Sequence, residues 1–449
     1  MEGQASYYCK PAHPRYVPAI PACFTTMSLE LSASRKPTRF WQTWAAGALL
    51  LVLVAVFTGS ACAFFLWSLD EVTRLRFQHP WLLALLPLGG WLSARIYQTW
   101  GNGSDAGTGL ILGEAKSPSA GAVGIPRRIA PLILASTLLT HLLGGSAGRE
   151  GTALQMGGGI AALFLRSARI PLKLVRLVIL SGVAAGFGGV FGTPFAGAVF
   201  AAEISRMRSA WGSLLHFLVA ALLADATCHA WGTTHTTYLI APLFPAEQPG
   251  ISELLAVATS IAAAGAVFGL GARLYVSLSK ECARALRTLI PSPSLRASTG
   301  GCVVIALVWL AGTSDYLGLG VLPKTSESVT LPFFFQTVEV RPWSWCWKML
   351  FTVVTLSSGF RGGEVTPLFF MGAALGNALS GILPAPSDLL AGLGLVALFG
   401  TAARTPIACW VMGLELFGIR QGPWLALACW VAFLVRGQET LYDPPPKQA

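Results

Sequence analysis

The chain has 449 residues, of which 54% are hydrophobic and only 11% are charged, and its mean hydropathy is +0.62. Soluble domains carry about 25% charged residues, so the composition argues against a water-soluble enzyme and against a disordered chain. The 49 glycines and 28 prolines are typical of membrane helices that pack closely or are interrupted inside the bilayer. The net charge of +11 comes from short basic clusters between apolar stretches, which indicates cytoplasmic loops rather than a nucleic-acid partner.

Residues 1–38 are rich in Pro, Ser and Tyr and lack an apolar run, so we expect a loose cytoplasmic N-terminal tail. Residues 438–449 are expected to form a short C-terminal tail, also in the cytoplasm. Between the tails we expect a transmembrane domain at 39–437, whose halves lie at about 40–231 and 251–436. The stretch 232–250 has no Lys or Arg and is expected to be external.

Apolar segments follow one another in chain order at 41–69, 80–98, 129–144, 151–165, 172–190, 193–205, 211–231, 251–287, 297–313, 344–358, 366–383, 388–402, 405–417 and 420–435. Several are too short to cross a bilayer as a straight helix. Helices that end inside the membrane must line a polar cavity or be buried in protein. The predicted fold is therefore an all-α polytopic membrane protein with broken transmembrane helices.

An internal repeat supports this architecture. The segments 193–203 and 405–415 both begin with Thr-Pro and end with Glu. Upstream, Glu150 and Glu364 each precede a Thr by two residues and each stand before an apolar, Met-Gly-containing segment, at nearly the same offset. Repeated halves favour a substrate site where the repeats meet, near the middle of the membrane.

The strongest local signal is the glycine-rich segment 144–152, because a helix is expected to begin at its end. A helix N-terminus with exposed backbone N–H groups favours an anion. Glu150 places a carboxylate there, and an acid that takes up a proton could alternate with an anion. The alternative is that Glu150 only caps its helix.

The segment 359–367 repeats this pattern around Glu364, Val365 and Thr366. The alternative for Glu364 is a helix cap or an ion pair with Arg361. A third glycine-rich break, 107–110, carries little information alone.

Other polar residues have simpler interpretations. Glu203 and Glu415 are expected to bind Arg or backbone near helix ends, and His141 and His216 to belong to the core. Nine scattered cysteines without CxxC spacing predict neither a disulfide framework nor a metal site, and we expect no cofactor.

Together the segments 148–151, 186–203 and 362–367 resemble the CLC family of chloride channels and proton-coupled anion exchangers. The resemblance covers about residues 40–442. It implies a double repeat of inverted topology and a homodimer with one pore in each subunit. Contacts between subunits would come from 193–231 and 405–436.

Departures from the chloride pattern point to one branch. Thr152 stands in place of a Pro, Val365 in place of a Phe, and Ile204 in place of the internal proton-transfer Glu. These changes resemble the fluoride/proton antiporter branch, in which a second essential Glu precedes Thr by two residues. The resemblance implies that Glu150 and Glu364 couple protons and gate the pore.

Tyr442 follows the last apolar segment, and by itself this position favours an anchor at the membrane interface. The resemblance instead implies a set of anion-binding residues, in which Thr108 replaces a serine and Tyr442 lines up with an inner-gate tyrosine. The expected set is Thr108, Gly109, Gly148, Arg149, Gly151, Thr152, Val365, Thr366 and Tyr442. Phe369 and Phe370 are candidate aromatic contacts of the ion.

The predicted function is proton-coupled fluoride export across the inner (plasma) membrane. The expected partners are a halide anion (fluoride, with chloride as a further candidate), protons, the lipid bilayer and a second copy of the chain, but no nucleic acid. A voltage-gated-type chloride channel or a chloride/proton exchanger of the same family is the first alternative. A membrane-embedded hydrolase that uses Glu and His is the second, although no HExxH motif supports it, and we do not expect an enzyme.

Overall fold

A computed structural model describes residues 37–118, 123–167, 172–241, 250–336 and 339–442. The chain divides into the units Met1–Trp44 and Ala45–Ala449, and the helix contacts and sites lie within the second unit. The predictions for residues 1–36 and 443–449 of the two tails lie outside the described residues.

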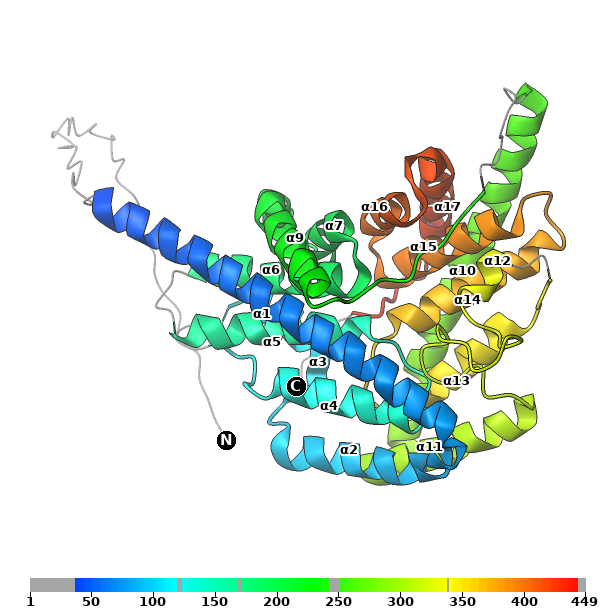
Figure 1. The fold of residues 1–449 in the computed structure, drawn as a ribbon, viewed down its shortest axis with the longest axis horizontal. Helices are drawn as coiled ribbons and strands as arrows, with labels where there is room; N and C mark the ends of the chain where they lie inside the picture. Colours follow the sequence, from blue (N-terminus) through cyan, green and yellow to red (C-terminus); the bar gives the residue numbers. More distant parts are fainter. Residues whose placement is uncertain (1–36, 119–122, 168–171, 242–249, 337–338, 443–449) are drawn as a thin grey trace, which may run out of the picture. The chain divides into compact units, whose positions relative to one another are not determined.

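The first half contains a series of helices that open after glycine- or proline-rich breaks. They are α1 (Pro37–Gln78), α2 (Leu86–Trp100), α3 (Gly107–Lys116), α4 (Ile129–Leu142), α5 (Glu150–Ser167), α6 (Leu172–Phe191), α7 (Pro194–Ile204), α8 (Arg208–Trp211) and α9 (Leu214–Ala230) (Figure 1).

The second half follows the same plan. Its helices are α10 (Ile251–Leu289), α11 (Pro293–Ala311), α12 (Phe333–Gln336), α13 (Ser344–Ser357), α14 (Val365–Ser380), α15 (Ser387–Ala403), α16 (Pro406–Phe417) and α17 (Gly422–Leu434). Short 3-10 turns at Pro80–Leu85, Ser104–Ala106 and Ile419–Gln421 complete the described elements.

The described residues form both long and short apolar helices. By length and composition, four helices of the described residues can cross a membrane: Ala45–Gln78, Leu174–Phe191, Ile251–Leu289 and Pro293–Ala311. Six more are apolar but have only 10–17 residues, among them α14 and the Thr-Pro helices α7 and α16. The predicted pattern of broken apolar helices is therefore confirmed. Helix α3 was not predicted, because the segment after Gly107 lacks a long apolar run.

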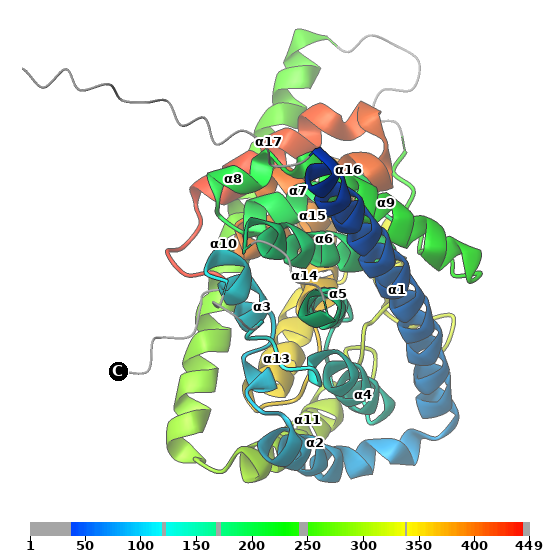
Figure 2. The same ribbon diagram turned by 90° about the vertical axis from the view of Figure 1, so that its left-hand side faces the viewer.

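The repeat is visible in the packing. In the first half α5 packs on α6, and α6, α7 and α9 contact one another; in the second half α14, α15, α16 and α17 do the same in the same order. The halves meet where α7 packs on α16, and both views show this group together (Figures 1 and 2). Helices α2 and α11 lie side by side in both views.

Glycines at equivalent positions allow two of these contacts. A Cβ atom on Gly157 of α5 would lie 2.0 Å from the carbonyl oxygen of Gly182 in α6. A Cβ atom on Gly372 of α14 would lie 2.1 Å from the carbonyl oxygen of Gly394 in α15. Close backbone approach between helices requires small residues, so the high glycine content serves the same pair of contacts in both halves.

Candidate ion-transport site

The two glycine-rich loops predicted to carry the chemistry meet through their backbones. The Gly148 N–H donates to the Gly363 carbonyl at 2.6 Å, and the Gly363 N–H donates to the Gly148 carbonyl at 2.7 Å. This exchange is an isolated antiparallel bridge. Equivalent segments of the two halves thus run in opposite directions where they touch, as an inverted repeat requires.

Only glycine fits at this crossing. A Cβ atom on Gly363 would lie 2.7 Å from the Gly151 nitrogen, and one on Gly148 would lie 3.0 Å from the Gly363 oxygen. Each loop also begins with a glycine in the left-handed region, Gly144 with φ +92 and Gly359 with φ +110. The glycine pattern of the sequence therefore specifies two sharp turns and one close backbone contact.

Glu150 begins α5, but its carboxylate reaches the helix of the other half. It accepts a hydrogen bond from the Thr366 N–H at 3.0 Å and another from the Thr366 hydroxyl. The Arg149 N–H lies 3.1 Å from the same carboxylate, and the side chain of Glu150 is only 1% exposed. A carboxylate at the N-terminus of α14 stands where that helix would hold an anion.

A cavity of about 790 Å³ begins beside this contact. The predicted site residues that line it are Thr108, Gly109, Gly151, Glu364 and Tyr442. Its charged lining also includes four basic side chains, Lys280, Arg284, Arg287 and Arg361, and the acidic side chains Asp105 and Glu439. The cavity thus brings residues from α3, α5 and α10, from the loop that precedes α14 and from the C-terminal segment into one polar space.

Glu364 occupies the N-cap position of α14, yet its side chain makes no capping hydrogen bond. It lies within electrostatic reach of Lys280, Tyr275 and Tyr442. The Arg361 guanidinium instead donates to the Asp105 carbonyl at 3.1 Å and covers the Tyr97 ring at 4.1 Å. Neither the cap nor the Arg361 ion pair therefore explains why an acid stands at position 364.

Tyr442 lies near both acids, since its hydroxyl is within electrostatic reach of Glu364 and of Glu150. Its ring also meets the Phe200 ring edge-on at 6.5 Å. This tyrosine joins the acidic pair to an aromatic cluster in the core.

The two candidate aromatic residues, Phe369 and Phe370, have different neighbours. Phe369 packs on Phe191 at 5.3 Å, and Phe191 in turn packs on Phe187 at 4.6 Å. Phe370 faces the other way, under the Nζ of Lys348 at 5.4 Å. Of the two, Phe369 belongs to the aromatic cluster that reaches Tyr442 through Phe200.

The family model described as "Voltage gated chloride channel" matches residues 88–437. The chain belongs to this family, the CLC family.

Similar proteins agree with this assignment. The "Chloride/fluoride channel protein" of Pseudomonas syringae pv. tomato is 40% identical over 430 residues, which are 93% of this chain and 90% of that protein. A solved "CLC-type fluoride/proton antiporter" is 30% identical with a TM-score of 0.81, covering 90% of this chain and 98% of its own. A "slow cyanobacterial Cl-/H+ antiporter" shares the fold at 18% identity and a TM-score of 0.71, covering 87% and 94%. The all-α double-repeat fold predicted from the sequence is confirmed.

Some of the expected anion-binding residues of this CLC chain do not line the cavity. The Thr152 hydroxyl is buried against α4, where it pairs with the Thr137 hydroxyl at 2.8 Å. The Arg149 side chain lies 3.4 Å from the Glu150 carboxylate, and the side chain of Val365 is fully buried. Anion contact by Arg149, Thr152 and Val365 stays a prediction, and the structure gives Thr152 a helix-packing contact that the sequence did not indicate.

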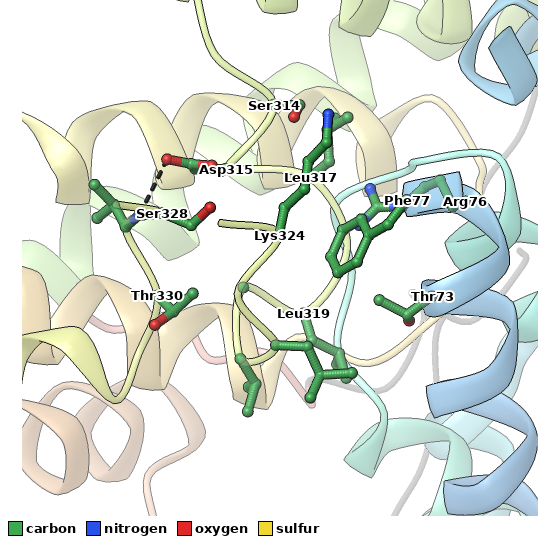
Figure 3. A pocket seen from close by; sticks show the side chains of 14 residues that line it. Thr73, Arg76, Phe77, Ser314, Asp315, Leu317, Leu319, Lys324, Ser328 and Thr330 are labelled. Atoms are coloured by element: carbon green, nitrogen blue, oxygen red, sulfur yellow. Dashed lines mark hydrogen bonds between the residues drawn. The ribbon is translucent and has the colours of Figure 1, made fainter. Parts of the chain in front are cut away.

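Near Gly144, in the loop 144–148, a small hollow of about 20 Å³ is lined by residues of α1, among them Arg76, and by residues of the segment 314–330 (Figure 3). The Gly318 N–H donates to the Gly145 carbonyl at 3.2 Å, which fixes this segment against the loop. The fully buried Lys348 donates to the Tyr316 and Gly318 carbonyls at 3.1 and 2.7 Å. Two buried cations, Arg76 and Lys348, thus lie close to Gly318, which contacts the loop.

His141 is buried, as predicted for a core residue, but the part that it and its neighbours play in holding the site in place was not predicted. The ring nitrogens of His141 contact the carbonyls of Thr137 and Ala147 at 2.8 and 3.0 Å, and the Ser146 hydroxyl pairs with Thr352 at 3.0 Å. These contacts anchor the loop before Glu150 to α4 and α13. A His and a Ser beside the glycines were visible in the sequence, but only the fold reveals their partners.

Proposed function

We propose that this CLC protein is a fluoride/proton antiporter that exports fluoride. The observation that carries the proposal is the position of the Glu150 carboxylate, held by the amide and the hydroxyl of Thr366 at the N-terminus of α14. These donors are the groups that a small, strongly hydrated anion needs when it leaves water.

Exchange follows from competition for these donors. When Glu150 is ionised, its carboxylate occupies the position and blocks the path. When Glu150 takes up a proton, it no longer needs two strong donors, and fluoride replaces it beside Thr366. Each cycle then moves a proton on Glu150 in one direction and an anion in the other.

The proton reaches Glu150 by way of the cavity in this proposal. Glu364 lines the cavity, and Tyr442 is within electrostatic reach of both acids. Lys280 on α10 lies near Glu364 and faces the same space. These groups provide a route that does not need the internal glutamate of chloride exchangers, whose place Ile204 takes.

Selectivity for fluoride is proposed from donor chemistry and from likeness. The hydroxyl of Thr366 offers a short, strong hydrogen bond, which benefits a compact anion more than a large one. The relative from Pseudomonas is named for both chloride and fluoride, and the solved structure with 30% identity is a fluoride/proton antiporter.

We also propose an orientation. The basic residues Lys280, Arg284 and Arg287 at the end of α10 line the cavity, and an excess of Lys and Arg is typical of the cytoplasmic side. The cavity would then open to the cytoplasm of an inner-membrane protein with both termini inside. The small hollow at Arg76 would face outward, closed by the loop that carries Glu150.

A homodimer in the bilayer completes the proposal. The segments expected to join the subunits carry large exposed apolar side chains, which are Phe195, Trp211, Leu215 and Leu222 in the first half and Ile407, Trp430 and Leu434 in the second. Lipid or a second copy of the chain would cover them. Cross-linking of single cysteines placed at positions 215 and 434 in membranes tests which of the two does so.

The deciding experiment reconstitutes the purified chain in liposomes and records fluoride, chloride and proton fluxes together. We expect fluoride efflux coupled to proton uptake and a much slower chloride flux. Equal efflux of the two halides with coupled protons would indicate the chloride exchanger, and efflux of either without proton movement would indicate a channel. Either result would overturn the proposal.

A further inference from the structure

Three side chains that can ligate a metal ion meet where α9 ends. Asp225 and His229 are one helical turn apart on α9, and His235 follows in the connecting segment. Their ligand atoms all lie within 4.8 Å of one another. We propose that Asp225, His229 and His235 bind a divalent transition-metal ion of the Zn²⁺ class.

The distances between the ligand atoms match those expected in a tetrahedral zinc site. The His229 Nδ1 lies 3.3 Å and the His235 Nε2 lies 3.7 Å from the Oδ1 of Asp225. Tetrahedral zinc holds nitrogen and oxygen ligands at about 2.0–2.1 Å, which places neighbouring ligand atoms about 3.3 Å apart. A single ion between the three side chains therefore needs only small rotations of the rings, and a fourth position stays open for water.

Asp225 and His235 have ligand atoms that are poorly satisfied, whereas the Nδ1 of His229 lies 3.0 Å from the Asp225 backbone carbonyl and would have to leave it to bind the ion. The Oδ1 of Asp225 and both ring nitrogens of His235 are buried without a well-formed hydrogen bond among the described residues. Buried polar atoms of this kind call for a partner. The side chains of His235 and Asp225 are 13% and 19% exposed, whereas His229 is 54% exposed and offers a way in for the ion.

The surrounding charges permit a cation. Asp225 and Glu415 lie within electrostatic reach of each other, which places a second carboxylate near the cluster. Arg149 lies within reach of His235, but its guanidinium is also 3.4 Å from the Glu150 carboxylate. Imidazole and carboxylate ligands suit zinc better than magnesium or calcium, which prefer oxygen.

The thiol nearby is not part of the proposed set. The Cys228 Sγ pairs with the Thr233 hydroxyl at 3.1 Å and is buried. Cysteine spacing therefore could not reveal this cluster, and the expectation of no metal site considered only cysteines.

A bound ion would fasten the connection between the two halves. The His235 ring covers Gly192 at the end of α6, where an added Cβ would lie 2.5 Å from the ring. The same segment reaches the second half, because the Ala241 N–H donates to the Asp388 carboxylate at 2.7 Å. An ion held by α9 and by His235 would reduce the freedom of residues 232–241.

The test uses the purified, full-length chain in detergent, freed of metal with a chelator and titrated with Zn²⁺ by calorimetry. We expect one saturable ion per chain, and an affinity at least about tenfold weaker in Asp225→Asn and His235→Ala. His79→Ala, which removes an exposed histidine elsewhere in the chain, serves as the matched control and should bind as the native chain does.

A second variant keeps the test decisive if the buried positions do not tolerate change. His229→Ala alters a mostly exposed ring, and we expect it to fold normally and to bind at least about tenfold more weakly. Undiminished binding by a well-folded His229→Ala chain would overturn the proposal, as would the absence of a saturable site. Loss of binding in Cys228→Ser with full binding in His235→Ala would place the ion on the thiol and also overturn it.

Discussion

Glu203, near the end of α7, caps the start of α16, and Glu415, near the end of α16, caps the start of α7. The Glu203 carboxylate accepts the N–H groups of the two residues after Pro406, at 3.2 and 2.8 Å. The Glu415 carboxylate accepts those of the two residues after Pro194, at 3.0 and 2.7 Å. The sequence interpretation that these acids bind backbone is confirmed, but the backbone belongs to the opposite half. This reciprocal pair fastens the two repeats together where α7 packs on α16.

Removing either acid should weaken the fold. Glu203→Ala and Glu415→Ala each leave two N–H groups at a helix start without an acceptor, and we expect a loss of about 1–3 kcal/mol in the free energy of unfolding. Thermal unfolding of the detergent-purified variants measures it. Glu327→Ala, which truncates an exposed acid, is the control. Unfolding midpoints equal to that of the native chain would show that these bonds contribute nothing.

Local sequence signals predicted much of this arrangement. Helix starts at Glu150, Val365, Pro194 and Pro406 follow from glycine-rich breaks and from Thr-Pro, because proline suits the first turn of a helix. The equivalence of the halves followed from the same residues at nearly constant offsets. These helix-start signals depend only on residues a few positions apart, so they can be recognised without knowledge of the fold.

Contacts between residues far apart in the chain could not be predicted from the sequence. Nothing in the pattern around Glu150 shows that its carboxylate meets Thr366, or that Gly148 and Gly363 exchange two hydrogen bonds. These contacts depend on how two inverted halves are placed, which only packing determines. The cluster around His235 could not be predicted for the same reason, because His235 lies outside α9, the helix that carries the other two residues.

Loss of the titratable group at Glu150 should uncouple transport. Glu150→Gln keeps the size of the side chain but cannot take up and release a proton. We expect proton uptake to fall to the level of protein-free liposomes, measured beside fluoride efflux. Glu71→Gln, at a mostly exposed acid, should exchange as the native chain does. Unchanged proton uptake by Glu150→Gln would mean that another group carries the proton.

For fluoride turnover, the hydroxyl group of Thr366 should matter more than the size of the side chain. Thr366→Val keeps the backbone amide but removes the hydroxyl that bonds Glu150, and we expect fluoride turnover to fall roughly tenfold to a hundredfold. That range corresponds to about 1.5–3 kcal/mol for a hydrogen bond to a charged group. Thr366→Ser should restore most of the rate. If valine and serine behave alike in the flux assay, the hydroxyl plays no part.

The bridge between the loops should tolerate no side chain. In Gly363→Ala the new methyl group would lie 2.7 Å from the Gly151 nitrogen, and backbone cannot move aside cheaply. We expect a loss of about 1–3 kcal/mol of stability, seen as aggregation on size-exclusion chromatography or a lower unfolding midpoint. Gly113→Ala, where an added Cβ meets nothing within 4 Å, is the matched control. A native-like Gly363→Ala protein would contradict the close contact.

The second acid offers the sharpest separation of function from stability. Glu364 stands at the N-cap of α14 without a capping hydrogen bond, and it faces the cavity near Lys280 and Tyr442. Since it caps nothing, Glu364→Gln should change the free energy of unfolding by less than about 0.5 kcal/mol. Since it is proposed to pass protons to Glu150, the same change should reduce fluoride/proton exchange at least about tenfold.

Three measurements on one preparation decide between the roles of Glu364. Coupled flux in liposomes reports the relay, the unfolding midpoint reports a cap, and the elution profile reports assembly. Glu364→Asp, which keeps a titratable carboxyl group, should retain part of the exchange, whereas Glu327→Gln should change none of the three. If Glu364 acts as a cap, its loss would lower the free energy of unfolding by about 1 kcal/mol, seen as a lower unfolding midpoint, and would leave the flux mostly intact. Near-normal exchange by a well-folded Glu364→Gln chain would therefore remove Glu364 from the proton route and leave Glu150 to exchange its proton with the cavity directly.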